Sequence, residues 1–139
     1  MRGAVVGLFV LGGLYGVVMS VVASILEARK PSNEASARQT LSDLNKAQAI
    51  YIEKSTVKTY GSLKQLISAG LVDSYLSSGR HNGYHFAIHV DKKHPQYEFS
   101  MTAEPIENSV TGDRYFFTNQ SGVLRFNYGS LADESSAST

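Results

Sequence analysis

The chain has 139 residues, enough for one small domain, and its formal net charge is +1 at pH 7. A charge this close to zero creates no strong field for nucleic acid or for an acidic substrate, so we predict no nucleic-acid partner. The sequence contains no cysteine. Disulfides, thiol catalysis and cysteine-based zinc or iron–sulfur sites are therefore excluded.

The first long segment, from Gly3 to Leu26, carries no charged residue. It is longer than the about 20 apolar residues that cross a bilayer core as a helix. It is also about twice as long as the apolar core of a cleaved signal peptide, although Val21-Val22-Ala23 offers a small-residue cleavage site. The sequence therefore predicts a transmembrane or filament-core helix over residues 1–30, with a cleaved signal peptide as the alternative.

Small residues recur at a spacing of four within this segment, at Gly12, Gly16, Ser20 and Ser24. This spacing places them on one face of a helix, where small side chains let two helix backbones approach closely. We predict that this face packs against other helices during assembly. The alternative is that glycine is simply frequent in membrane helices.

Two places in the N-terminal half predict a bend. Gly12 and Gly13 stand together, and glycine lowers the stability of a helix interior. Pro31 lacks an amide hydrogen, so it either kinks the first helix or occupies the first turn of a new one. We expect the helix to bend at Gly12, Gly13 and Pro31.

Residues 32–54 show a second helical pattern, in which apolar residues recur three or four positions apart. That spacing puts them on one face of a helix and leaves charged and amide side chains on the other faces. Leu41, Leu44 and Tyr51 belong to the apolar face. We predict that this face covers a sheet.

The rest of the chain predicts one short helix and a sheet. Ser62-Leu63-Lys64-Gln65 is a capping-box pattern, which favours a helix over residues 62–69. Alternating apolar residues, separated by turn residues, then predict four strands. Their ranges are 84–90, 97–103, 114–118 and 123–128. The predicted fold class is α+β, with a long N-terminal helix, half membrane-spanning and half amphipathic, packed on a four-stranded antiparallel sheet.

This pattern divides the chain into three parts. Residues 1–30 form the apolar helix, residues 31–128 form the globular domain, and residues 129–139 form a flexible serine-rich tail.

No set of residues predicts catalysis. The histidines at positions 85 and 89 share one face of a strand but lie roughly 13 Å apart along it, too far to bind one metal ion. The sequence has no Gly-x-Ser-x-Gly motif and no phosphate-binding loop outside the apolar segment. We predict no enzymatic activity, no cofactor and no metal.

The order of these elements resembles that of type IV pilins and of the major pseudopilins of type II secretion. Local sequence is also similar, in residues 33–37 followed by Leu41, Asn45 and Ala47, and in the later run 111–126. The resemblance covers about residues 33–128. It extends to the first helix only in its general character.

The N-terminus departs from that family. Pilins usually carry a basic leader ending in glycine and then Phe-Thr-Leu-Ile-Glu, whose glutamate pairs with the N-terminal amine of a neighbouring subunit. This sequence has no acidic residue before Glu27. Some minor pseudopilins at filament tips also lack that glutamate.

The resemblance implies a structural subunit of a pilus-like or pseudopilus filament. Its partners would be copies of itself in a helical filament, the membrane before assembly, and the pilus or secretion assembly machinery. It implies a bacterial inner-membrane protein with its body in the periplasm, although the lysines and arginines after the apolar segment favour a cytoplasmic body. The alternatives are a non-polymerising membrane-anchored periplasmic binding module and a minor or tip pseudopilin.

Overall fold

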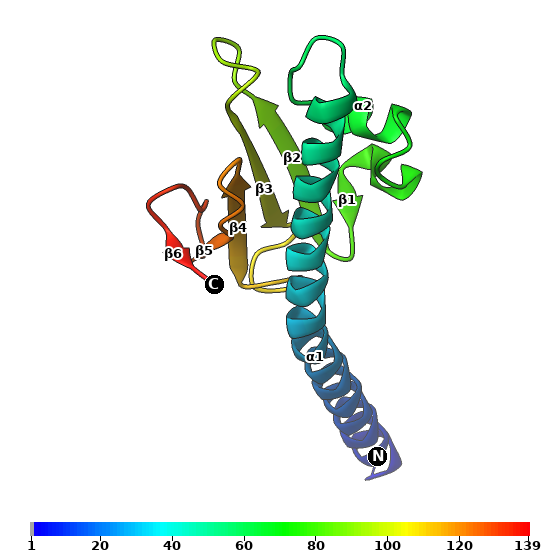
Figure 1. Cartoon of the computed structure of the whole chain (residues 1–139). Coiled ribbons are helices and arrows are strands. Elements are labelled where there is room, and N and C mark those ends of the chain that lie inside the picture. The colour runs from blue at the N-terminus through cyan, green and yellow to red at the C-terminus, as the bar shows by residue number, and fades with distance from the viewer. Residues whose placement is uncertain (1) are drawn as a thin grey trace.

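The computed structural model describes the backbone of residues 2–139 and the side chains of residues 15–139. The chain forms a long helix α1 (Arg2–Lys54), a short helix α2 (Leu63–Ser68) and a 3-10 helix η1 (Ser74–Ser78). Strands follow as β1 (Arg80–His81), β2 (Tyr84–Val90), β3 (Phe99–Pro105), β4 (Arg114–Asn119), β5 (Arg125–Tyr128) and β6 (Ala137–Ser138). In Figure 1, one part of α1 lies along the sheet and the other part extends away from it.

The six strands form one antiparallel sheet in the order β1-β2-β3-β4-β5-β6. The prediction of four strands is therefore wrong, although the four predicted strands correspond to β2, β3, β4 and β5. β1 and β6 each contain only two residues. A strand this short has no apolar alternation, so its sequence carries no signal for a strand.

The C-terminal residues complete the sheet. The segment 129–139 contributes β6, which pairs with β5 through Arg125↔Ser138 and Phe126↔Ala137. The amide of Thr139 also donates to the carbonyl of Leu124 at 3.0 Å. The composition of the segment does not reveal this pairing, and its predicted flexibility stays a prediction.

The predicted fold class is also wrong in its membrane-spanning helix. In the described part of the chain, no helix is both long enough and apolar enough to cross a membrane. The described apolar run begins at Tyr15 and stops at Leu26, and the charged residues Glu27, Arg29 and Lys30 follow it. The earlier part of the predicted segment lies outside the residues whose side chains are described.

The core lies between α1 and the inner face of the sheet. Leu41 and Leu44 of α1 are buried there with Tyr84, Met101 and Phe116 from the strands. Alternate residues of β3 are buried, as expected for a strand with one face on the core. Hydrophobic burial at this single interface therefore holds the helix on the sheet.

Two polar features shape the region around α2. The capping box predicted at Ser62 is confirmed, because its hydroxyl accepts from the amide of Gln65 and the Gln65 side chain accepts from the amide of Ser62. Gln48 of α1 is fully buried and bonds both ways with the backbone of Gly61, at 2.6 and 2.8 Å. These bonds satisfy a buried amide and fix the loop before α2 against α1.

Replacement of Leu41 by alanine tests this interface. Leu41 is 0% exposed, so L41A removes apolar contacts and leaves a cavity, and we expect a loss of about 2–5 kcal/mol in the free energy of unfolding. Leu131 is 62% exposed, and L131A should change stability by less than about 0.5 kcal/mol. Urea unfolding followed by circular dichroism measures both. Equal effects would contradict the assigned core.

Candidate functional site

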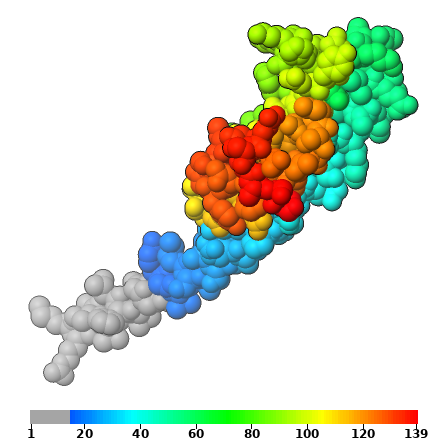
Figure 2. All heavy atoms as spheres, turned by 60° about the vertical axis from the view of Figure 1, so that its left-hand side comes forward, coloured from blue at the N-terminus to red at the C-terminus, as the bar shows by residue number. Residues whose placement is uncertain are grey.

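The N-terminal part of α1 exposes apolar side chains on all sides. Every residue from Tyr15 to Arg29 is exposed in the single chain, and Lys30 is the first buried residue among those of the helix whose side chains are described. The large apolar side chains exposed there are Tyr15, Val17, Val18, Met19, Val21, Val22, Ile25 and Leu26. Figure 2 shows this segment projecting beyond the sheet. We call residues 15–26 the exposed apolar segment.

A continuous apolar surface of this kind marks an interaction site, because soluble single chains rarely leave one in water. The predicted packing residues Gly16, Ser20 and Ser24 all lie in the exposed apolar segment. A Cβ atom added at Gly16 would meet no other atom within 4 Å. The described part of this face, from Gly16 to Ser24, is therefore open to solvent in the single chain.

The other predicted residues have varied outcomes. Gly12 and Gly13 lie outside the residues whose side chains are described, so their proposed bend and packing stay predictions. α1 continues through Pro31 without a break in its helical structure. Of the predicted sheet-covering face, Leu41 and Leu44 are buried in the core, and Tyr51 packs against it while partly exposed.

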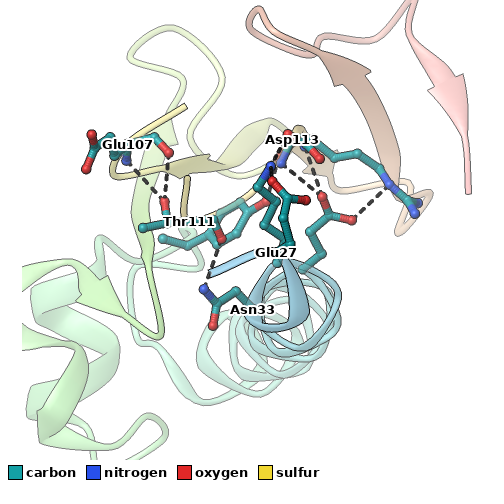
Figure 3. Close-up of polar contacts among 9 residues, drawn as sticks. Glu27, Asn33, Glu107, Thr111 and Asp113 are labelled. Atoms are coloured by element: carbon teal, nitrogen blue, oxygen red, sulfur yellow. Dashed lines mark hydrogen bonds and ion pairs between the residues drawn. The ribbon is translucent and has the colours of Figure 1, made fainter. Parts of the chain in front are cut away.

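A cluster of polar contacts joins α1 to the segment that precedes β4, where the helix leaves the sheet (Figure 3). Glu34 is almost buried, and one of its carboxylate oxygens accepts from the amides of Asp113 and Arg114 at 3.0 and 3.2 Å. The other oxygen pairs with Nε of Arg114 at 3.0 Å. Asn33 donates to the carbonyl of Thr111 at 2.9 Å. We call these contacts the Glu34 clamp.

Lys30, one turn before Glu34 on α1, adds two ion pairs next to this clamp. Its Nζ lies 2.8 Å from a carboxylate oxygen of Glu27 and 3.4 Å from one of Asp113. The hydrogen bond to Glu27 raises the pKa of the Lys30 ammonium, burial opposes that effect, and the hydrogen bond to Asp113 adds to it. The charged lysine thus connects the base of the exposed apolar segment to the sheet domain.

Tyr84 lies beneath the clamp. Its hydroxyl donates to the carbonyl of Arg114 at 2.7 Å. Burial, and then the negative charges of Glu34 and Asp113, raise the pKa of the phenol well above its ordinary value. Gly112 is required beside it, because a Cβ there would overlap the Tyr84 hydroxyl. The clamp therefore depends on close packing as well as on charge.

Sequence reasoning did not find this clamp. Glu34 and the Arg114 amide that it accepts from are 80 positions apart in the chain, so no local spacing connects them. The sequence offered only one indication, that segments 33–37 and 111–126 are both similar to the same protein family. That similarity does not predict a contact between the two segments. The pairing is a product of the tertiary structure.

A shallow groove runs between α1 and the turn after β4. Arg38, Asn45 and Lys46 line it from the helix, with Thr118 and Leu124 opposite, around a volume of about 460 Å³. Asn45 donates to the Thr118 hydroxyl and to a nearby carbonyl at 3.3 Å. The residues lining it offer no nucleophile with an adjacent base, so the groove provides no catalytic arrangement.

The four histidines, at positions 81, 85, 89 and 94, do not form one cluster. His81 stacks on Tyr75, while His85 and His89 are exposed on β2. His94 lies in the loop between β2 and β3, next to two carboxylates. That arrangement was not anticipated from the sequence, because the carboxylates come from both ends of the loop.

Comparison of this chain with protein-family models, with curated proteins and with solved structures finds no match. The resemblance to pilins and pseudopilins therefore rests on the sequence features described above.

The Glu34 clamp can be tested by E34Q, which keeps an oxygen for the two backbone amides but removes the charge. We expect a loss of about 2–3 kcal/mol in the free energy of unfolding, because charged hydrogen bonds are lost from a nearly buried group. The exposed pair of Asp43 and Lys46, at 3.5 Å, provides the control. D43N should cost about 0.5 kcal/mol or less. Comparable losses in urea unfolding would refute the clamp's role.

Tyr84 should make the free energy of unfolding depend on pH in the alkaline range. Its folded pKa is raised, so above about pH 10 the phenol ionises in the unfolded chain but not in the folded one. The stabilising contribution of Tyr84 is therefore complete below pH 10 and is lost as pH rises. Y84F should cost about 1–3 kcal/mol at pH 8 by leaving the Arg114 carbonyl without its donor. Urea unfolding should show the difference between the two proteins shrinking above pH 10, and a constant difference would argue against this.

Proposed function

We propose that this protein is a structural subunit of a filament, assembled from copies of the same chain through the exposed apolar segment of α1. The observation that carries the proposal is that residues 15–26 are helical, apolar and exposed on every side. A single helix cannot bury all of its faces by itself. It requires apolar neighbours on several sides, and other copies of the same helix provide them.

The energy available from this surface is large enough to drive association. Full burial of one large aliphatic side chain contributes about 1.5–3 kcal/mol. The exposed apolar segment carries eight large apolar side chains, from Tyr15 to Leu26. Association costs an estimated 4–15 kcal/mol in lost translational and rotational freedom. Burial of several of these side chains in each subunit offsets that cost.

The shape of the chain supports a filament in which helices lie inside and sheets lie outside. The exposed apolar segment extends beyond the sheet domain (Figures 1 and 2), which leaves it open to helices from neighbouring copies. The Glu34 clamp and Lys30 connect its base to the sheet domain. Repeated contacts between different faces of identical copies generate a helical filament if the rotation does not close into a ring.

The resemblance to type IV pilins and type II pseudopilins supports the same proposal. Under it, the sheet domain lies outside the cytoplasm, assembly depends on separate pilus or secretion machinery, and the subunit performs no catalysis. The absence of an acidic residue before Glu27 favours a second candidate, a minor subunit at a filament tip. Such a subunit would enter filaments of another protein but would not form them alone.

Gly16 provides a direct test of assembly. G16L places a bulky side chain on the proposed packing face, and we expect it to reduce filament formation by about tenfold or more, since close helix approach is lost. The single chain should remain folded, because a Cβ at Gly16 meets no atom within 4 Å. Val57 is 67% exposed in the loop after α1, outside the exposed apolar segment. V57L is therefore the matched control and should assemble normally.

Electron microscopy of the purified full-length chain measures assembly, and circular dichroism measures folding. Filaments of G16L equal in number and length to those of the original protein would show that the small-residue face is not used. If the original protein forms only monomers, alone and with other filament subunits, the filament proposal is wrong and a monomeric binding module takes its place.

A further inference from the structure

The loop between β2 and β3 brings two carboxylates together on the outer face of the sheet. Beyond the pair Val90↔Phe99, the amide of Asp91 donates to the carbonyl of Glu98 at 3.0 Å, which places these two residues opposite each other. Like charges directly opposite on neighbouring strands destabilise a sheet. A cation between the two carboxylates would remove that repulsion.

His94 lies between these carboxylates. Its Nδ1 is 3.5 Å from Oδ1 of Asp91 and 3.8 Å from Oε1 of Glu98. One ligand atom from each of the three residues lies within 4.8 Å of the others. The loop therefore gathers one imidazole nitrogen and two carboxylate oxygens in a small volume.

These distances suit a tetrahedral metal ion. Zinc binds histidine nitrogen and carboxylate oxygen at about 2.0–2.2 Å, so neighbouring ligand atoms in a tetrahedral site lie about 3.3–3.6 Å apart. The separations from His94 to Asp91 and Glu98 are 3.5 and 3.8 Å. The third separation, between the carboxylate oxygens of Asp91 and Glu98, is no more than 4.8 Å.

The backbone of the loop holds the three residues in place. Oδ1 of Asp91 accepts from the amides of Lys93 and His94 at 2.8 and 2.7 Å. The amide of Glu98 donates to the carbonyl of His94 at 2.9 Å. Metal-binding carboxylates are commonly oriented by such hydrogen bonds.

A cavity of about 140 Å³ adjoins Asp91 and Glu98, and His89 and Glu134 also line it. A water molecule in this cavity would complete four ligands around the ion. Glu134 already accepts from the side chain of Asn119 at 3.0 Å, which positions it near the cavity.

We propose that Asp91, His94 and Glu98 bind a divalent transition-metal ion, with Zn²⁺ as the preferred ion. Imidazole nitrogen favours zinc and its neighbours in the transition series, whereas calcium and magnesium prefer sites made entirely of oxygen. The ion connects both ends of the β2–β3 loop, which lies at the end of the domain opposite the exposed apolar segment (Figure 1). Metal binding therefore stiffens a surface that remains accessible when helices pack together.

The test is a Zn²⁺ titration of the metal-free full-length chain by isothermal calorimetry, with H94A and D91N beside it. D91N keeps an oxygen for the amides of Lys93 and His94, so the loop is preserved while the charged ligand is lost. We expect one Zn²⁺ per chain, and each substitution should weaken binding by about tenfold or more. His85 is exposed on β2 outside the cluster, so H85A is the matched control and should bind Zn²⁺ normally.

Competition with Ca²⁺ distinguishes a specific zinc site from non-specific binding of cations to surface carboxylates. Ca²⁺ in large excess should not displace the bound Zn²⁺. The proposal is overturned if Zn²⁺ does not bind below about 1 mM, if H94A binds as tightly as the original protein, or if H85A weakens binding as much as H94A does. Equal displacement by Ca²⁺ would also overturn it. In each of these cases His94 is only a neighbour of Asp91 and Glu98 in the loop.

Discussion

The position of α1 on the sheet depends on one nearly buried carboxylate, that of Glu34. A carboxylate removed from water is costly unless donors satisfy it, and here two backbone amides and the Arg114 guanidinium do so. All of these donors come from the segment that begins β4. Sliding α1 along the sheet by a turn would leave Glu34 without these partners, so the clamp favours the observed register. The close packing of Leu41 and Leu44 in the core favours the same register.

This constraint divides α1 into two parts with different roles. From Lys30 onward the helix packs its apolar face on the sheet, while from Tyr15 to Arg29 every residue is exposed. The division follows from the chain itself, since Glu27 and Lys30 end the apolar run and Lys30 bonds back to Asp113. The proposed assembly surface and the proposed metal site thus lie at opposite ends of the molecule (Figure 1). A change at the β2–β3 loop therefore lies far from the proposed assembly surface.

Periodic segments were the most predictable part of this fold. Apolar alternation identified β2 and β3, and the apolar positions three or four apart identified the face of α1 that carries Leu41 and Leu44. The same approach overlooked β1 and β6, because a two-residue strand is made by its partner and not by its own pattern. It also predicted a membrane-spanning helix, whereas no helix in the described residues is long and apolar enough for one. The candidate sites were less predictable than the elements.

The sequence by itself determined α2, the four longer strands and the face of α1 that packs on the sheet, because helical and strand periodicities are local properties read over a few neighbouring residues. It also placed the boundary between the apolar and the charged parts of α1, which is a matter of composition. Only the tertiary structure decided that Glu34 meets Arg114 and that Asp91, His94 and Glu98 converge. Those contacts depend on sheet register, loop geometry and helix packing. These arise from interactions between distant residues, and no short stretch of sequence encodes them.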